Sequence, residues 1–176
     1  VKETDPEGNA AEWTYEAGRL VEHRQSDGGA RTYAYDRRGW LIEEQDAFGG
    51  VTRYRHDQAG NVQRLKAPDG AETLRRHDSA GRVVAEVRPD GSERSYDYDE
   101  EGNLVAETLD GITTSHRHDL LGRVVETVDP AGRSTRFDYD AQGRRTGRTA
   151  PDGSTERWTW CPDGGLESHD DGEGGE

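Results

Sequence analysis

The sequence has few of the residues from which a compact hydrophobic core is built. Its 176 residues include 9 Leu, 2 Ile, 11 Val and 2 Phe, 24 in all, and no Met. A share of these four residues below about 20 %, combined with a large net charge, usually indicates disorder. No segment approaches the ~20 consecutive apolar residues that a spanning helix needs. The composition therefore argues against a conventional globular enzyme and against membrane insertion, and disorder has to be tested against the order of the residues.

Cysteine and positive charge are also scarce. The single cysteine, Cys161, excludes an internal disulfide framework and a metal site built from several cysteines. Lys and Arg number 23 against 37 Asp and Glu, which gives a net charge of −14. This balance argues against a nucleic-acid module and against docking on anionic lipid, because both need a basic face. The chain begins at Val1, in the middle of a pattern and without an initiator Met, so we expect it to be a piece of a longer protein. The pattern of a secretory leader is not found at its start.

What the sequence does have is a motif that recurs about every 21 residues. Asp-x-x-Gly occurs, with glycine steps of 21, 21, 21, 20 and 21, at Asp36–Gly39, Asp57–Gly60, Asp78–Gly81, Asp99–Gly102, Asp119–Gly122 and Asp140–Gly143. A ring stands immediately before each of these aspartates, as Tyr35, His56, His77, Tyr98, His118 and Tyr139. Cys161–Gly164 continues the register with Cys in place of Asp. A fixed period of this length indicates a repeat architecture.

A second turn signal lies halfway between these motifs. It contains Gly8, Gly28, Gly49, Gly70, Gly91, Gly111, Gly132 and Gly153. Two turns per repeat leave two segments of about seven residues, which suits strands and is too short for stable helices. Asp followed three residues later by Gly favours a type I turn that ends in a left-handed glycine. We therefore predict hairpins, with positive φ at Gly39, Gly60, Gly81, Gly102, Gly122 and Gly143.

The spacing also predicts the register of each hairpin. If the three residues after Asp36 form the loop, Tyr35 faces Leu41, Tyr33 faces Glu43, and the other face carries Ala34 beside Ile42. The same rule pairs His56 with Val62, His77 with Val83, Tyr98 with Leu104, His118 with Val124 and Tyr139 with Arg145. A ring opposite an aliphatic residue is a favourable cross-strand pair. This agreement in five repeats argues against disorder, and it predicts that the six rings form a ladder on one face of a continuous sheet.

The expected fold is all-β, a curved or spiralling antiparallel ribbon of about eight hairpins. Neither face is apolar enough for a dry sandwich, so ladder hydrogen bonds, ring stacking and turns should hold the sheet. We interpret residues 1–11 as the end of a preceding repeat, with Asp5-Pro6-Glu7-Gly8 as its turn. Residues 12–165 are the ribbon, and the acidic, Gly-rich residues 166–176 are expected to form a disordered tail.

Three segments carry a family resemblance. They are Tyr33–Gly39, Tyr96–Leu104 and Phe137–Arg144, each with two rings flanking one residue, then Asp and the turn Gly. They resemble the YD repeats of the Rhs (rearrangement hotspot) family over about residues 3–164. That family includes bacterial polymorphic toxins, the small component of insecticidal toxin complexes, and animal teneurins. The resemblance implies a β-sheet that spirals into a hollow shell, which in the toxins encloses a C-terminal toxic domain until delivery.

The resemblance also implies partners and a place in the cell. The partners would be the flanking repeats, the C-terminal cargo domain of the parent chain and a secretion apparatus, and the protein would be secreted or at the cell surface. The sequence has neither the family's plug segment nor a toxin domain, so it resembles shell wall. The alternative hypothesis is an extracellular module for carbohydrate or cell-surface binding, because Trp13, Trp40, Trp158 and Trp160 could stack on sugars.

No catalytic, cofactor or metal site is predicted. The repeated aspartates lie two strands apart, about 10 Å, which is too far to share one calcium ion, so we assign them to turns. His116 and His118 share a face but lack a third zinc ligand, and the imidazoles in the ring positions are interpreted as ladder rings. Cys161 lacks an oriented base, since His169 falls in the expected tail. The prediction is therefore a non-catalytic structural segment.

Overall fold

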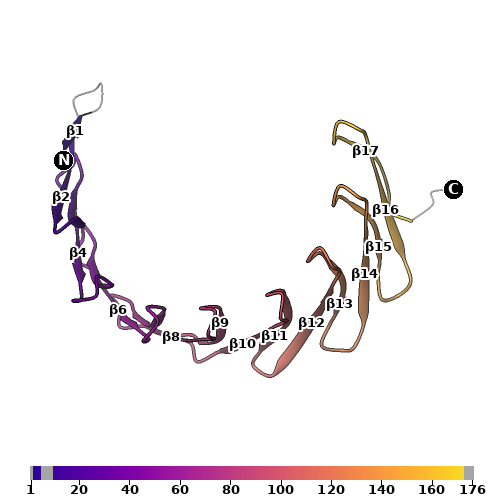
Figure 1. Cartoon of the computed structure of the whole chain (residues 1–176), viewed down its shortest axis with the longest axis horizontal. Coiled ribbons are helices and arrows are strands. Elements are labelled where there is room, and N and C mark those ends of the chain that lie inside the picture. Colours follow the sequence, from indigo (N-terminus) through magenta and orange to yellow (C-terminus); the bar gives the residue numbers. More distant parts are fainter. Residues whose placement is uncertain (1, 5–9, 173–176) are drawn as a thin grey trace. The chain divides into compact units, whose positions relative to one another are not determined.

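The computed structural model is all-β, as predicted, and it describes residues 2–4 and 10–172 (Figure 1). No helix capable of crossing a membrane occurs among these residues. The seventeen strands are β1 (Lys2–Thr4), β2 (Ala10–Glu16), β3 (Arg19–Arg24), β4 (Ala30–Tyr35), β5 (Leu41–Gln45), β6 (Val51–His56), β7 (Val62–Lys66), β8 (Glu72–His77), β9 (Val83–Val87), β10 (Glu93–Tyr98), β11 (Leu104–Leu109), β12 (Ile112–His118), β13 (Val124–Val128), β14 (Ser134–Tyr139), β15 (Arg145–Thr149), β16 (Thr155–Trp160) and β17 (Leu166–Asp170).

The chain divides into two compact units, Val1–Glu93 and Arg94–Glu176. In the first unit, each strand from β1 to β8 pairs antiparallel with the strand that follows it in the sequence. In the second unit, the strands from β10 to β17 pair in the same way. Each unit is therefore a meander of hairpins, which is the antiparallel ribbon that the repeat predicts.

The two kinds of turn share one hydrogen-bonding pattern. In the turn that starts at Asp36, the N–H of Gly39 donates to Asp36 O at 3.0 Å, and the N–H of Asp36 donates to Trp40 O at 2.9 Å. The halfway turns close in the same way, for example from Ala67 to Ala71. The six glycines expected to be left-handed have φ values between 76° and 96°, in agreement with the prediction. Only glycine adopts this region without strain, which explains its fixed place in the repeat.

The single 20-residue step in the repeat comes from a shortened halfway turn. Asp110 and Gly111 connect β11 to β12 with φ values of 49° and 82°. Two consecutive residues with positive φ are characteristic of a two-residue type I′ hairpin. Ala17 and Gly18, with φ of 47° and 78°, form the same short turn between β2 and β3. The repeat therefore tolerates loss of a loop residue without loss of the hairpin.

The predicted register is correct next to the turn and wrong beyond it. Tyr35 lies opposite Leu41, as expected, and the corresponding pairs hold in the other five repeats. Tyr33, however, lies opposite Glu44 rather than Glu43, and Ala34 lies opposite Glu43 rather than beside Ile42. The cause is a β-bulge that shifts the register between Ala34 and Tyr35. The extra residue comes from the strand after the turn, and the bulge recurs in every Asp-x-x-Gly hairpin.

The expected tail is wrong over its first five residues. Leu166–Asp170 forms β17, which pairs with β16 from Arg157↔Asp170 to Trp160↔Leu166. The turn from Cys161 to Gly165 has the same two hydrogen bonds as the other turns, so it completes one more hairpin. The side chain of His169 stacks on Trp158 with ring centroids 5.2 Å apart. Residues 173–176 of the expected tail lie outside the described residues, as does the proposed turn at residues 5–8.

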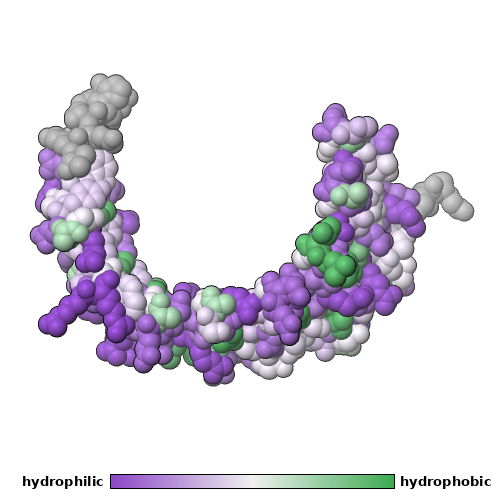
Figure 2. Space-filling model, viewed as in Figure 1, coloured by the Kyte–Doolittle hydropathy of each residue, from purple (hydrophilic) through white to green (hydrophobic). Residues whose placement is uncertain are grey.

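The described residues of the two units form no hydrophobic core. No hydrophobic side chain is buried in the part of the chain that the structure describes. Figure 2 shows hydrophobic residues in small groups separated by hydrophilic surface on the face in view. Within each unit the strands form a single layer, so side chains project from one of its two faces and no second layer covers them. Cohesion must therefore come from hydrogen bonds and from contacts between neighbouring repeats, as expected from the composition.

Candidate functional site

The register places the predicted ring residues on one face within each unit. In the first unit, Tyr33 pairs with Glu44, and Glu44 pairs with Thr52 on the next strand. Tyr54 and His56 follow Thr52 by two and four residues on that strand. Paired residues share a face and faces alternate along a strand, so Tyr35 and His56 lie on the same side. The same reasoning adds His77 in this unit and joins Tyr98, His118 and Tyr139 in the second. We call this side the ring face and the other side the back face.

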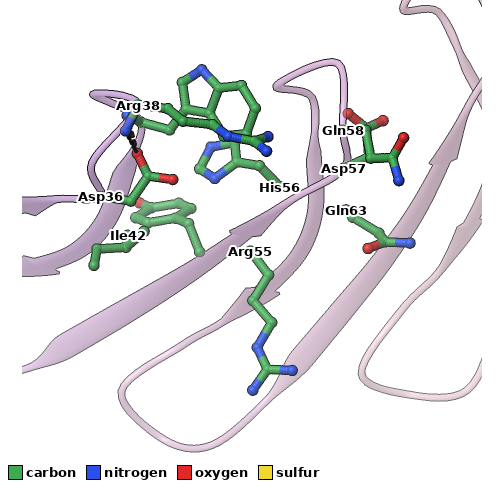
Figure 3. Close-up of a pocket in the computed structure, with 10 residues that line it drawn as sticks. Asp36, Arg38, Ile42, Arg55, His56, Asp57, Gln58 and Gln63 are labelled. Atoms are coloured by element: carbon green, nitrogen blue, oxygen red, sulfur yellow. Dashed lines mark hydrogen bonds between the residues drawn. The ribbon is translucent and has the colours of Figure 1, made fainter.

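Each turn aspartate holds its own loop closed. One carboxylate oxygen of Asp36 accepts hydrogen bonds from the N–H groups of Arg38, at 2.8 Å, and Trp40, at 3.0 Å (Figure 3). The bond from the N–H of Trp40 holds the pKa of Asp36 below its usual 3.8. Where the residue four positions after the aspartate is Arg or Asn, its side chain donates to the second carboxylate oxygen. Arg123 Nε donates to Asp119 Oδ2 at 2.7 Å, and Asn61 Nδ2 donates to Asp57 Oδ2 at 3.0 Å.

The residue after the turn glycine also reaches the next repeat. Arg123 Nη1 donates to the carbonyl of Asp140 at 3.0 Å, and its guanidinium lies 4.9 Å from the centre of the Tyr139 ring. In return, the Tyr139 hydroxyl donates to the carbonyl of Val124 at 2.8 Å. We call this set of contacts the clasp. It joins residues 15 to 17 positions apart, which lie in successive repeats.

The clasp recurs with different rings. Arg144 Nη1 donates to the carbonyl of Cys161 at 3.0 Å, and Trp160 Nε1 donates to the carbonyl of Arg145 at 2.7 Å. In the first unit, the Tyr35 hydroxyl donates to the carbonyl of Leu20 at 2.9 Å, with the Arg19 guanidinium 5.9 Å from the ring centre. A cation over an aromatic face contributes about 0.5–1 kcal/mol at exposed sites. The clasp thus supplies directional contacts where apolar burial is missing.

Histidine rings have a different partner. His77 Nδ1 lies 3.8 Å from Asp57 Oδ2, the oxygen that also accepts from Asn61. The His77 side chain is only 8 % exposed, so this polar group is packed between its neighbours. The ring of His56 lies 5.4 Å from the ring of Trp40, centre to centre. The residue after the turn glycine therefore varies with the ring one repeat later: Arg19 with Tyr35, Arg123 with Tyr139 and Arg144 with Trp160, but Trp40 with His56, Asn61 with His77 and Asn103 with His118.

This matching predicts energetic coupling between Asn61 and His77. We expect Asn61→Arg and His77→Tyr each to destabilise the protein alone, because each places a mismatched partner in a packed position. The double variant recreates the Arg–Tyr pairing of Arg123 and Tyr139 and should recover about 1 kcal/mol or more relative to additivity. A double-mutant cycle in urea measures this coupling. Additive effects would show that the two positions are independent.

Acid should destabilise the protein through the turn aspartates. Side-chain hydrogen bonds hold the pKa values of Asp57, Asp78 and Asp119 below their usual 3.8. The donor to Asp57 is Asn61, and the donor to each of the other two is the arginine four residues later. A carboxyl whose pKa is lower in the folded state stabilises that state fully above about pH 5, and this stabilisation is lost as the pH falls through the folded pKa. The Tm, followed by circular dichroism, should therefore fall between about pH 5 and about pH 2. A Tm that stays constant over this range would contradict the role given to these carboxylates.

The repeats match a known family model. The model, described as RHS Repeat, matches residues 16–51, 35–72, 77–114 and 118–155, which together make up more than half of the chain. The chain belongs to the RHS repeat family. No curated protein matches the sequence. The match to the RHS Repeat model confirms the family resemblance predicted from the sequence.

The RHS chain is also similar in fold to parts of Tc toxin structures. One is the Photorhabdus luminescens Tc holotoxin pore with a TccC3 mutation, with a TM-score of 0.67 and 13 % identity over 94 % of this chain and 12 % of that chain. Another is TcdB2-TccC3-Cdc42, with a TM-score of 0.69 and 16 % identity over 87 % of this chain and 10 % of that chain. A third is TcdB2-TccC3, with a TM-score of 0.68 and 16 % identity over 86 % of this chain and 10 % of that chain. The RHS chain thus spans about a tenth of the length of these structures, and the likeness concerns the fold.

A groove beside the Trp40 and His56 rings tests the carbohydrate alternative. It has a volume of about 560 Å³, and its lining includes Trp40, His56, Arg38 and Tyr54 (Figure 3). The Trp40 ring contacts His56, and the Arg38 guanidinium lies 4.9 Å from its centre. The other tryptophans are engaged similarly: Trp13 stacks on His23, Trp158 on His169, and Arg144 lies over Trp160. A sugar needs an open ring face, so these contacts favour a structural role for the rings.

The remaining candidates are not brought together. No group of three or more potential metal ligands occurs among residues 2–4 and 10–172. His116 Nδ1 is 3.1 Å from Thr127 Oγ1, a neutral partner. His169 lies opposite Trp158, which is three residues before Cys161 in the sequence. Its Nε2 is 3.6 Å from Glu156 Oε2. The Cys161 carbonyl, rather than its thiol, has the identifiable role, as the acceptor for Arg144.

Sequence reasoning missed the residues that follow the turn glycines. Arg19, Arg123 and Arg144 were not singled out, although they form the clasps. Their signal was present in the sequence, because Arg precedes Tyr or Trp by 16 residues and Asn precedes His by 15 or 16. Comparison of adjacent repeats, rather than of equivalent positions alone, would have found them.

Proposed function

We propose that this RHS chain is a non-catalytic wall segment of a β-shell that encloses a C-terminal toxin or other cargo of its parent chain for secretion. The observation that carries the proposal is the run of hairpins joined by clasps, in a fold shared with much longer Tc toxin chains, of which this chain covers 10 % in one case. A single-layer sheet without a core suits a wall, because its stability depends on repeat-to-repeat contacts and extends by adding repeats. The periodic polar residues form turns and clasps, which supports a structural role.

The terminal strands support a place within a longer wall. Within the described residues of each unit, β17 pairs with β16 and β1 pairs with β2, and each leaves a second edge whose backbone groups another strand can use. In the proposed assembly, flanking repeats pair with these edges. An exposed edge of this kind would otherwise favour aggregation, which a continuous wall avoids. The partners are therefore the neighbouring repeats and the enclosed cargo, and the whole protein is exported or displayed at the cell surface.

Protease protection of the full parent chain tests enclosure. The purified parent is digested with a nonspecific protease and compared with its C-terminal region expressed alone. We expect the C-terminal region to survive in the parent and to be digested rapidly on its own. Digestion at equal rates would overturn the proposal. Growth assays in susceptible cells that express residues 1–176 test the non-catalytic part, and growth arrest abolished by one substitution at Cys161 would reveal a catalytic site.

A further inference from the structure

The back face of the first unit carries a concentration of positive charge that the ring ladder does not use. Arg53 and Arg55 alternate with Tyr54 and His56 on β6, so their side chains lie on the face opposite the rings. Figure 3 shows Arg55 extending away from Asp36, Arg38 and His56. The strands β7 and β8 add Arg64, Lys66 and Arg76 to this face through the registers Arg55↔Arg64, Arg53↔Lys66 and Arg64↔Leu74. We call these five residues the basic patch.

The basic patch contains two like-charged pairs directly opposite each other. Arg53 faces Lys66 and Arg55 faces Arg64 across the β6–β7 ladder. Like charges in this arrangement destabilise a sheet. Acidic residues outnumber basic ones in this protein, 37 to 23, so most basic side chains can have acidic neighbours. On the β6–β7 hairpin, four basic side chains instead lie next to one another. The arrangement therefore has a stability cost that the fold itself does not require.

Carboxylates within the protein neutralise only part of the patch. Arg53 pairs with Glu43 at 2.9 Å, while Arg64 and Lys66 share the single carboxylate of Glu72. Arg55 and Arg76 are exposed and have no carboxylate partner among the described residues. Five cations thus face two carboxylates, and two guanidiniums keep their donors free for an external anion.

The geometry points to an extended acidic polypeptide segment as the ligand: we propose that the basic patch binds such a segment through alternate Asp or Glu side chains. Arg53 and Arg55, like Arg64 and Lys66, are two residues apart on a strand, a spacing of about 7 Å. Carboxylates at alternate positions of an extended peptide repeat at the same distance and project to the same side. Guanidiniums bind carboxylates with paired hydrogen bonds, which makes Arg55 and Arg76 the expected anchors.

The size of the patch and the charge around it favour a short peptide over nucleic acid. Three strands span about 10 Å across the sheet. A long polyanion would extend past this width onto a chain whose net charge is −14 and would be repelled there. A segment with two or three carboxylates at alternate positions spans about 7–14 Å, which matches the size of the patch. The basic patch lies on the back face, and peptide binding there does not depend on enclosure of a cargo.

Peptide binding to the 176-residue chain tests the inference. The probe is a fluorescein-labelled octapeptide of alternating Glu and Thr, with a Gln and Thr octapeptide as its uncharged control, titrated by fluorescence anisotropy at low salt. We expect the Glu peptide to bind and the Gln peptide not to bind. Arg55→Gln/Arg76→Gln should weaken binding by about fivefold or more, since two charge-assisted contacts are lost. The matched control Arg37→Gln/Arg157→Gln removes two exposed arginines elsewhere and should change binding less than about twofold.

A stability measurement separates this function from a structural role. Because Arg55 faces Arg64, its neutralisation should leave the Tm unchanged or raise it while binding is lost. Three results would overturn the proposal: no binding of the Glu peptide, an equal loss in the control variant, or a lowered Tm in Arg55→Gln/Arg76→Gln. Tighter binding of a single-stranded DNA dodecamer than of the Glu peptide would also overturn it, in favour of a nucleic-acid surface.

Discussion

Replacing Gly60 with alanine is expected to lower the free energy of unfolding by about 2–4 kcal/mol. Gly60 has a φ of 96°, where a residue with a Cβ is strained by about 1–2 kcal/mol. The added Cβ would also lie 3.0 Å from two carbons of the Trp40 ring, closer than ordinary contact. Because Trp40 is packed against His56, the ring cannot move without disturbing the contact between repeats. Urea denaturation followed by tryptophan fluorescence measures the change.

Gly70→Ala is the matched control for this prediction. Gly70 has nearly the same φ, 88°, but an added Cβ would meet nothing within 4 Å. This variant should therefore cost only the backbone strain, about 1–2 kcal/mol. The difference between the two variants isolates the packing of the turn against the preceding repeat. Equal losses would mean that Trp40 does not pack on the Gly60 turn as described.

Removal of the Arg123 side chain should destabilise the protein by about 2 kcal/mol more than removal of Arg133. Both arginines donate from Nε to the aspartate four residues earlier, each at 2.7 Å. Arg123 also donates to the Asp140 carbonyl and covers the Tyr139 ring. A hydrogen bond contributes about 1 kcal/mol and an exposed cation–π contact about 0.5–1 kcal/mol, which accounts for the difference.

The comparison of Arg123→Ala with Arg133→Ala separates the clasp from the turn. Both variants lose the same salt bridge to a turn aspartate, so that loss cancels. Urea denaturation gives the free energies, and hydrogen exchange at the amides of β13 to β15 shows where protection is lost. Equal destabilisation by the two substitutions would locate the contribution of Arg123 in its own turn and contradict the clasp.

The features that follow from local chemistry were predictable from the sequence. Asp36 and Gly39 define a turn by their spacing, and the position of Tyr35 immediately before the turn determines its partner, Leu41. The register beyond this point was not predictable from spacing alone. The bulge at Ala34 and Tyr35 shifts Tyr33 onto Glu44, and nothing in the alternation of residues marks the extra one.

The features that depend on contacts between repeats were harder to predict. The clasp between Arg123 and Tyr139 joins residues 16 apart, so neither repeat contains the information alone. Composition was misleading at Leu166–Asp170, where Gly-rich and acidic surroundings suggested disorder. The turn ending at Gly165 keeps the register there, and the stacking of His169 on Trp158 holds β17 in place. Position in the repeat was a better guide than local composition.

The heat-capacity change of unfolding tests most directly whether clasped hairpins without a hydrophobic core hold this protein together. When globular proteins unfold, their heat capacity rises by about 12–15 cal/mol/K per residue, mainly because buried apolar surface becomes exposed to water. No hydrophobic side chain is buried among the described residues, so differential scanning calorimetry of the chain should show one or more cooperative transitions with about 8 cal/mol/K per residue or less. A cooperative transition with the full globular value would contradict the account, because it would require a buried apolar core that a single-layer ribbon does not contain.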